Sequence, residues 1–191
     1  QAETLRIASQ GDATSLDPHS HNESFTNYFL ANVYEGLVAR DKDFAITGQL
    51  AQSWEQVDET TWQFTLREGV TFHDGAEFAA DDVIFSMDRA LSETSNFKHV
   101  LASVASYRAV DDMTILDKQW SEANGAAMPI NLQAEEKAFS ATNANGTGPF
   151  SVVSRAQGEK TTLAAFDGYW GDAGNVTKVV FTPINNAATL V

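Results

Sequence analysis

The spacing of apolar side chains changes along this chain, and that change limits the folds open to it. From Glu23 to Leu37, apolar residues recur at the three- and four-residue spacing of an amphipathic helix. Ser53–Val57 and Thr61–Leu66 instead alternate apolar with polar residues, which predicts the two strands of a hairpin. Ala80–Leu91 returns to helical spacing. Because these segments do not follow a strict strand–helix–strand repeat, the sequence predicts a mixed α/β fold with antiparallel hairpins.

Other segments extend this prediction. Asp81 and Asp82 fall in the first turn of the helix at 80–91, where carboxylates oppose the positive end of the helix dipole. We also expect strands at 4–8 and 178–182, hairpins at 107–110 with 114–116 and 150–154 with 161–166, and helices at 117–123 and 131–139.

Composition excludes several classes of protein. The 191 residues are 43% hydrophobic and 20% charged, as in globular domains. A net charge of −14 argues against nucleic-acid binding and against docking on an anionic membrane. The absence of cysteine excludes disulfides, cysteine zinc sites and a catalytic thiol. No apolar run approaches the 18 residues of a membrane span. We interpret the start, Gln1–Thr4 without an initiator Met, as that of a chain whose signal peptide has been removed.

The histidines do not predict a metal site. His19 and His21 are two residues apart in a loop, and no carboxylate supplies an obvious third ligand, so we interpret them as solvated. His73 precedes Asp74 and Gly75, which favours a turn residue that hydrogen-bonds the backbone.

No catalytic motif is present. The sequence has no Gly-x-Ser-x-Gly elbow, P-loop or dinucleotide-binding glycine motif after a strand, which argues against a hydrolase or nucleotide enzyme. Gly146–Pro149 is rich in glycine, but a strand follows it instead of the helix that a phosphate cradle needs, so it predicts a tight bend. Trp170 lies in a compact turn, where we expect an exposed ring that could cover a surface. The sequence therefore predicts a protein that is not an enzyme.

Six collinear motifs give the chain a resemblance to a known family. The set resembles the extracytoplasmic solute-binding proteins of family 5, which are the peptide-, dipeptide- and nickel-type receptors of ABC importers. The motifs, in order, are Ser15–His19, Tyr34–Leu37, Ala51–Gly75, Phe78–Ser86, Asn145–Phe150 and Tyr169–Gly171.

The resemblance implies a fold and a division of the chain. Members have a type II periplasmic-binding-protein fold with two hinged lobes, and this chain corresponds to the first lobe, with the second absent. The resemblance divides that lobe into a core subdomain, residues 1–45 plus 145–191, and an inserted subdomain, residues 46–144. Relatives carry an extra strand, turn and helix where Asp112–Ile115 and Asp117–Trp120 abut here. The chain is thus either a first-lobe fragment with a deletion near 116–117 or a reduced relative.

The resemblance also implies where a solute binds. In the family, the residues after the Asp-Pro-His motif reach the cleft, and here these are His21, Asn22, Glu23, Ser24 and Phe25. Asn22 can exchange hydrogen bonds with a peptide backbone, and Glu23 can pair with a terminal ammonium. Alternatively, Asn22 or Ser24 caps the helix that follows, and the two roles can coexist.

The function implied by the resemblance is that of the solute-binding component of an ABC importer. It would capture peptides in the periplasm or another extracytoplasmic space, with or without a lipid anchor, and deliver them to the permease. No cofactor is implied. The alternatives are a non-peptide solute, such as a nickel chelate, an opine, a sugar or glutathione, and a truncated lobe without binding activity.

Overall fold

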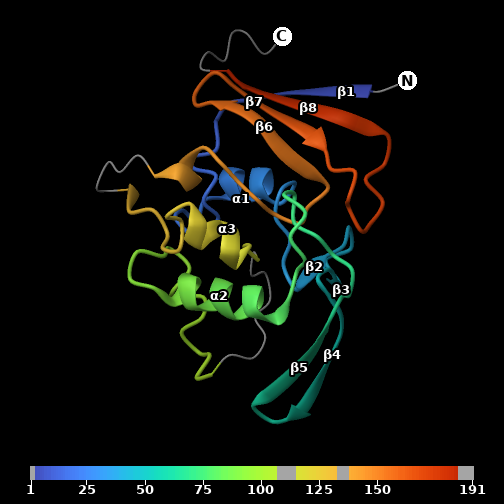
Figure 1. Cartoon of the computed structure of the whole chain (residues 1–191), viewed down its shortest axis with the longest axis vertical. Helices are drawn as coiled ribbons and strands as arrows, with labels where there is room; N and C mark the ends of the chain where they lie inside the picture. The colour runs from blue at the N-terminus through green and yellow to red at the C-terminus, as the bar shows by residue number, and fades with distance from the viewer. Residues whose placement is uncertain (1–2, 107–114, 133–137, 185–191) are drawn as a thin grey trace.

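A computed structural model describes residues 3–106, 115–132 and 138–184 of the chain (Figure 1). The described elements confirm a mixed α/β fold. In chain order they are β1 (Glu3–Ser9), α1 (Ser24–Leu30), β2 (Val38–Arg40), β3 (Ile46–Gly48), β4 (Ala51–Asp58), β5 (Thr61–Leu66), α2 (Ala80–Leu91), α3 (Lys118–Ala123), the 3-10 helix Phe139–Ala141, β6 (Phe150–Ala156), β7 (Lys160–Ala165) and β8 (Val176–Pro183).

A four-stranded mixed sheet forms the upper layer in Figure 1. Its order is β1-β8-β7-β6, with β1 and β8 parallel and the other neighbours antiparallel. Helix α1 lies beneath this sheet, and the rings of Phe29 and Phe181 meet edge to face with centroids 4.7 Å apart. Leu16, Val33 and Leu163 are fully buried in the same cluster. This cluster is the hydrophobic core that joins the first helix to the last strands.

The lower part combines two short hairpins with helices α2 and α3. Strands β2 and β3 form one antiparallel pair, and β4 and β5 form the other, which projects at the foot of Figure 1. A second apolar cluster packs the β4–β5 hairpin against α2, with Leu50, Phe72 and Ile115 fully buried. The first turn of α2 carries Asp81 and Asp82, as predicted from the helix dipole.

The prediction for the first helix was too long. Helix α1 ends at Leu30, and the chain continues as a turn where the sequence favoured a helix to Leu37. The carbonyls of Asn32 and Val33 accept hydrogen bonds from the amides of Phe150 and Gly148, at 3.1 and 2.9 Å. A tertiary contact with the glycine-rich bend therefore takes the carbonyls that a longer helix would use.

That contact requires glycine. A Cβ atom at Gly146 would lie 2.2 Å from the Val33 carbonyl oxygen, and one at Gly148 would lie 2.7 Å from the same atom. The bend predicted for Gly146–Pro149 is thus confirmed, and its reason is the close approach of two backbones.

Most other elements match the sequence predictions. The hairpins β4–β5 and β6–β7, helices α2 and α3, and strands β1 and β8 are confirmed. Of the hairpin expected at 107–116, residues 107–114 lie outside the described residues, and Ile115 and Leu116 are buried but not in a strand. Of the helix expected at 131–139, residues 133–137 lie outside the description, and Phe139 begins a 3-10 helix.

Candidate functional site

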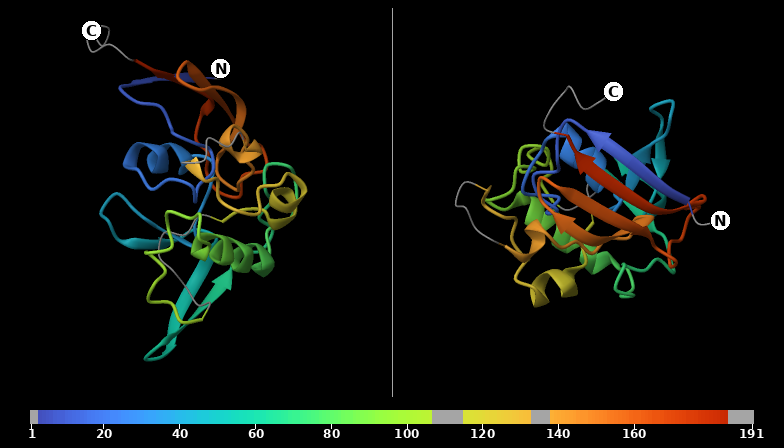
Figure 2. Two further views of the ribbon diagram at one scale, coloured as in Figure 1. Left: turned by 90° about the vertical axis from the view of Figure 1, so that its left-hand side faces the viewer. Right: turned by 90° about the horizontal axis from the view of Figure 1, so that it is seen from above.

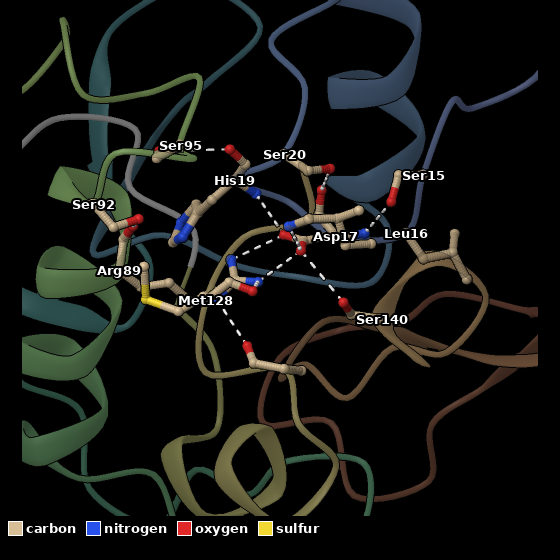
Figure 3. A network of polar contacts seen from close by, with 12 residues as sticks. Ser15, Leu16, Asp17, His19, Ser20, Arg89, Ser92, Ser95, Met128 and Ser140 are labelled. Carbon is tan, nitrogen blue, oxygen red and sulfur yellow. Dashed lines mark hydrogen bonds and ion pairs between the residues drawn. The ribbon is translucent and has the colours of Figure 1, made fainter. Parts of the chain in front are cut away.

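A buried ion pair lies at the centre of the loop that precedes α1. The guanidinium of Arg89 on α2 donates to both carboxylate oxygens of Asp17, at 2.9 and 2.7 Å (Figure 3). Neither side chain has any solvent exposure. The Asp17 carboxylate also accepts the amides of His19 and Ile130 and the hydroxyl of Ser140. Such a bidentate pair fixes both position and orientation.

The charge of Asp17 is retained despite burial. Burial by itself raises the pKa of this carboxyl group, because a charged form loses its hydration. The hydrogen bonds and positive charge of Arg89 outweigh that effect, so the pKa lies below its usual value of 3.8. The ion pair is therefore intact at neutral pH.

Three loops meet around this ion pair. Arg89 also donates to the carbonyls of Ala126 and Met128, at 3.0 and 3.2 Å, which holds the segment after α3. The amide of Asn96 donates to the carbonyl of His19 at 3.0 Å, and the Asn96 side chain donates to the carbonyl of Ser20. Residues 17–23, 93–100 and 126–132 thus form one connected surface, although they are far apart in the sequence.

Of the five residues expected to bind a solute, His21, Asn22 and Glu23 lie on this surface, and Ser24 and Phe25 begin helix α1 directly after it. Asn22 and Ser24 are exposed, and His21, Glu23 and Phe25 are half-buried. His21 lines a polar hollow of about 480 Å³, together with Thr94, Ser95, Asn96 and Asn131. Asn22 lines a second hollow of about 580 Å³, whose other walls include Tyr28, Arg40, Phe97 and Val100. The structure places His21 and Asn22 in two hollows, whereas Glu23, Ser24 and Phe25 line neither of the two.

The helix cap is not the residue that the sequence suggested. Glu23 caps α1, because its two carboxylate oxygens accept the amides of Phe25 and Thr26 at 2.8 and 3.0 Å. Both hydrogen bonds lower the pKa of Glu23, and the one from the Phe25 amide has the larger effect. Asn22 instead accepts a hydrogen bond from the side chain of Asn27 at 2.9 Å. Asn22 and Ser24 were wrong as caps because the longer Glu23 side chain reaches the first-turn amides.

The two loop histidines differ in their surroundings. His19 is buried, with 1% of its surface exposed, so the prediction that it is solvated was wrong. Its ring packs against Phe97 at a centroid distance of 5.9 Å. Within the described residues, no group of three or more His, Cys, Asp or Glu side chains is arranged to hold a metal ion.

A second buried carboxylate, Glu35, was missed by the sequence analysis. It accepts hydrogen bonds from the Thr147 hydroxyl at 2.9 Å, the Trp170 indole at 2.8 Å and the Tyr169 hydroxyl at 3.1 Å. Burial raises the pKa of Glu35, and the three hydrogen bonds act in the opposite direction. Three of the collinear motifs therefore meet at one side chain. The presence of all three motifs in one sequence was the signal that could have pointed to this site. The spacing of the motifs along the sequence did not indicate that they are in contact.

Two neighbouring predictions had different outcomes. Trp170 is half-buried, and the Arg67 guanidinium lies 4.0 Å from its ring centroid, so the expectation of an exposed ring was wrong. His73 hydrogen-bonds the backbone, as predicted: Nε2 lies 2.9 Å from the Gly148 carbonyl oxygen, and Nδ1 accepts the Gly146 amide. Burial lowers the pKa of His73.

Comparison with known proteins identifies the family. The model of bacterial extracellular solute-binding proteins, family 5, matches residues 45–191. The chain belongs to this family. Family 5 proteins bind solutes and are not enzymes. Across the described residues, none of the helices has the length and apolar character needed to cross a bilayer.

Curated relatives in family 5 are much longer than this chain. The glutathione-binding protein GsiB of Salmonella paratyphi A is 30% identical over 182 residues, which cover 88% of this chain and 36% of that protein. GsiB of Pectobacterium atrosepticum is 31% identical over 177 residues, or 86% of this chain and 34% of that protein. The chain thus spans about a third of the length of these relatives.

Solved structures share the fold. The periplasmic binding protein DppA of Helicobacter pylori, in complex with the peptide STSA, matches with a TM-score of 0.81 at 26% identity, over 98% of this chain and 44% of that one. MoaA of A. tumefaciens R10, in complex with mannopinic acid, matches with a TM-score of 0.82 at 26% identity, over 98% and 42%. The type II periplasmic-binding-protein fold is therefore confirmed over part of its usual length.

Proposed function

We propose that this family 5 chain is one lobe of the solute-binding component of an ABC importer, and that it captures peptides in the periplasm. The observation that carries the proposal is the surface built around Asp17 and Arg89, which presents His21 and Asn22 beside two hollows. A surface fixed by a buried ion pair is preorganised, which lowers the entropy cost of binding.

The proposed contacts follow from the free hydrogen-bonding capacity of the loop. Asn22 uses its side-chain oxygen to accept from Asn27, so we assign its N–H groups to a peptide carbonyl. Both oxygens of Glu23 bind helix amides, so we assign to Glu23 the positioning of the loop and a negative charge that attracts a terminal ammonium. We place His21, Ser24 and Phe25 along the flanks of the solute.

We also propose that the lobe consists of a core subdomain, residues 1–45 plus 145–191, and an inserted subdomain, residues 46–144. The two apolar clusters support this division in part, because the first unites α1 with the four-stranded sheet and the second unites the β4–β5 hairpin with α2. A second lobe, contributed by chain beyond this one, would close over the solute and be stabilised by contacts with it.

A non-peptide solute is the second candidate. Arg40 lines the larger hollow and offers a cation to a carboxylate group. This favours carboxylate-bearing solutes such as an opine or glutathione, and both compounds fit the names of relatives: MoaA is complexed with mannopinic acid, and GsiB is named for glutathione. The third alternative, a truncated lobe that binds nothing, predicts no heat of binding for any of these compounds.

Calorimetric titration tests the proposal. The probes are a mixture of di- to pentapeptides, glutathione, mannopinic acid and nickel–histidine, each added to the chain and to its Asn22→Ala variant. If peptides bind, we expect Asn22→Ala to weaken binding about tenfold, the effect of one lost hydrogen bond. Asn175→Ala, an exposed asparagine in the turn before β8, is the matched control. If Asn22→Ala and Asn175→Ala bind peptides with equal affinity, Asn22 is not part of the binding site and the proposal for this loop is wrong.

A further inference from the structure

The loop between β2 and β3 holds an aromatic residue in an unusual conformation. Phe44 has φ of 61°, and within the described residues it is the sole non-glycine residue with positive φ. Its side chain is 78% exposed. Left-handed backbone is unfavourable for a residue with a Cβ atom, so a glycine would serve the turn better. The fold by itself therefore does not account for the Phe44 ring.

A dense set of hydrogen bonds keeps Phe44 in place. The Asp41 carboxylate accepts the amides of Asp43 and Ala45 at 2.8 and 3.0 Å. The Asp41 amide donates to the Ala45 carbonyl at 2.9 Å, and the Phe44 amide donates to the Asp41 carbonyl at 3.0 Å. Arg40 donates to the Phe44 carbonyl at 3.0 Å. A strained residue that its surroundings hold so firmly is a candidate for function.

The loop stands beside the solute-binding surface. Val38, Ala39 and Arg40 of β2 form part of the wall of the larger hollow, which Asn22 also lines. In the left view of Figure 2, the β2–β3 loop projects on the same side as α1. Arg40 lines this hollow and also donates to the Phe44 carbonyl, so the tip of the loop adjoins the wall of the hollow.

We propose that Phe44 is a docking anchor that inserts into an apolar pocket on the membrane subunits of the importer. The inference rests on the proposed function, since those subunits receive the solute and must approach the hollow that we assign to it. A rigid aromatic side chain loses little conformational entropy on binding, which suits an anchor in a transient complex.

The charges near Phe44 favour a protein partner over a lipid surface. Arg40 and Lys42 balance Asp41 and Asp43, so the loop is locally neutral in a chain of net charge −14. An anionic lipid surface would repel such a chain, whereas a neutral aromatic tip fits an apolar pocket in a protein.

The test uses Phe44→Ala and Phe44→Gly in the solute-loaded protein. The probe is a nanodisc that holds the membrane subunits of its importer, and the affinity is measured by surface plasmon resonance. We expect both variants to bind at least tenfold more weakly, with solute affinity unchanged in calorimetry. Val153→Ala on β6, which truncates a side chain that is 62% exposed, is the control and should bind normally.

Phe44→Gly separates docking from stability. Glycine relieves the backbone strain at this position, which offsets the greater freedom it gives the unfolded chain. We therefore expect its melting temperature to be equal to or above that of the parent, so that weaker docking cannot be ascribed to unfolding.

The other outcomes would overturn the inference. One such outcome is that both Phe44 variants bind the nanodisc with the affinity of the parent. Another is that Val153→Ala weakens this binding as much as the Phe44 variants do. A third is that the parent binds anionic nanodiscs without membrane subunits and the Phe44 variants bind them more weakly. Sedimentation that shows a dimer dependent on Phe44 would assign the ring to a second copy instead. Absence of solute binding by the parent in calorimetry would count against the proposed function. Calorimetry is independent of the docking measurement, so the two failures can be told apart.

Discussion

Removing Arg89 should destabilise the chain strongly, because its partner would remain buried. In Arg89→Leu, the Asp17 carboxylate loses two charge-assisted hydrogen bonds while its side chain stays without solvent contact. The carbonyls of Ala126 and Met128 lose their donor as well. Breaking a buried ion pair from one side costs about 3–5 kcal/mol.

That cost is a large part of the stability of an ordinary domain, which is about 5–15 kcal/mol. Urea unfolding at neutral pH, followed by far-ultraviolet circular dichroism, measures it directly. Lys42→Ala is the control, because the Lys42–Asp43 pair is 87% and 71% exposed and should contribute no measurable stability. The double variant Asp17→Leu/Arg89→Leu should lose less than the sum of the two single variants, since no charge is left unpaired.

The pH dependence provides a second readout. The folded pKa of Asp17 is lower than that of the unfolded chain, so the ion pair stabilises the fold above the ordinary carboxyl pKa of 3.8. This contribution is lost as the pH falls through the lowered folded pKa.

If Arg89→Leu lowers the free energy of unfolding by less than about 1 kcal/mol, the reasoning is refuted, because the Asp17 carboxylate would then be in water or in a neutral form.

The remaining predictions concern Glu35 and the glycine-rich bend. Burial raises the pKa of Glu35, so its neutral form stabilises the fold at acid pH and that contribution is lost as the pH rises through the folded pKa. In urea unfolding, the parent should therefore lose stability relative to Glu35→Gln as the pH rises above the ordinary carboxyl pKa of 4.5. A difference in stability that stays constant with pH would contradict this. Gly146→Ala should cost about 3 kcal/mol or more, because its Cβ would lie 2.2 Å from the Val33 oxygen. Gly11→Ala, where a Cβ meets nothing within 4 Å, should be neutral, and equal losses in the two variants would exclude the clash as the cause.

Local elements of this fold could be predicted well because their signals are local. The alternation at 61–66 and the helical spacing at 80–91 each place apolar residues on one face, and both segments form the expected strand and helix. Helix α1 was overestimated because its end depends on Gly148 and Phe150, which lie more than 110 residues away. Periodicity carries no information about such a contact.

The candidate site was only partly predictable, for the same reason. The resemblance indicated residues 21–25, and the structure shows His21 and Asn22 beside hollows, but it also shows that Glu23 is a helix cap. The burial of His19 and the half-buried state of Trp170 were missed, since a residue in a loop or turn gives no periodic signal of burial.

The sequence by itself determined the fold class, the absence of thiol chemistry and the family. These follow from side-chain periodicity, composition and the order of motifs, all of which can be read along the chain. Only the tertiary structure decided that Asp17 pairs with Arg89, 72 residues away, and that Glu35 gathers three motifs. The physical reason is that a buried charge is tolerated only where distant segments supply its partners, and those partners become neighbours only when the chain folds.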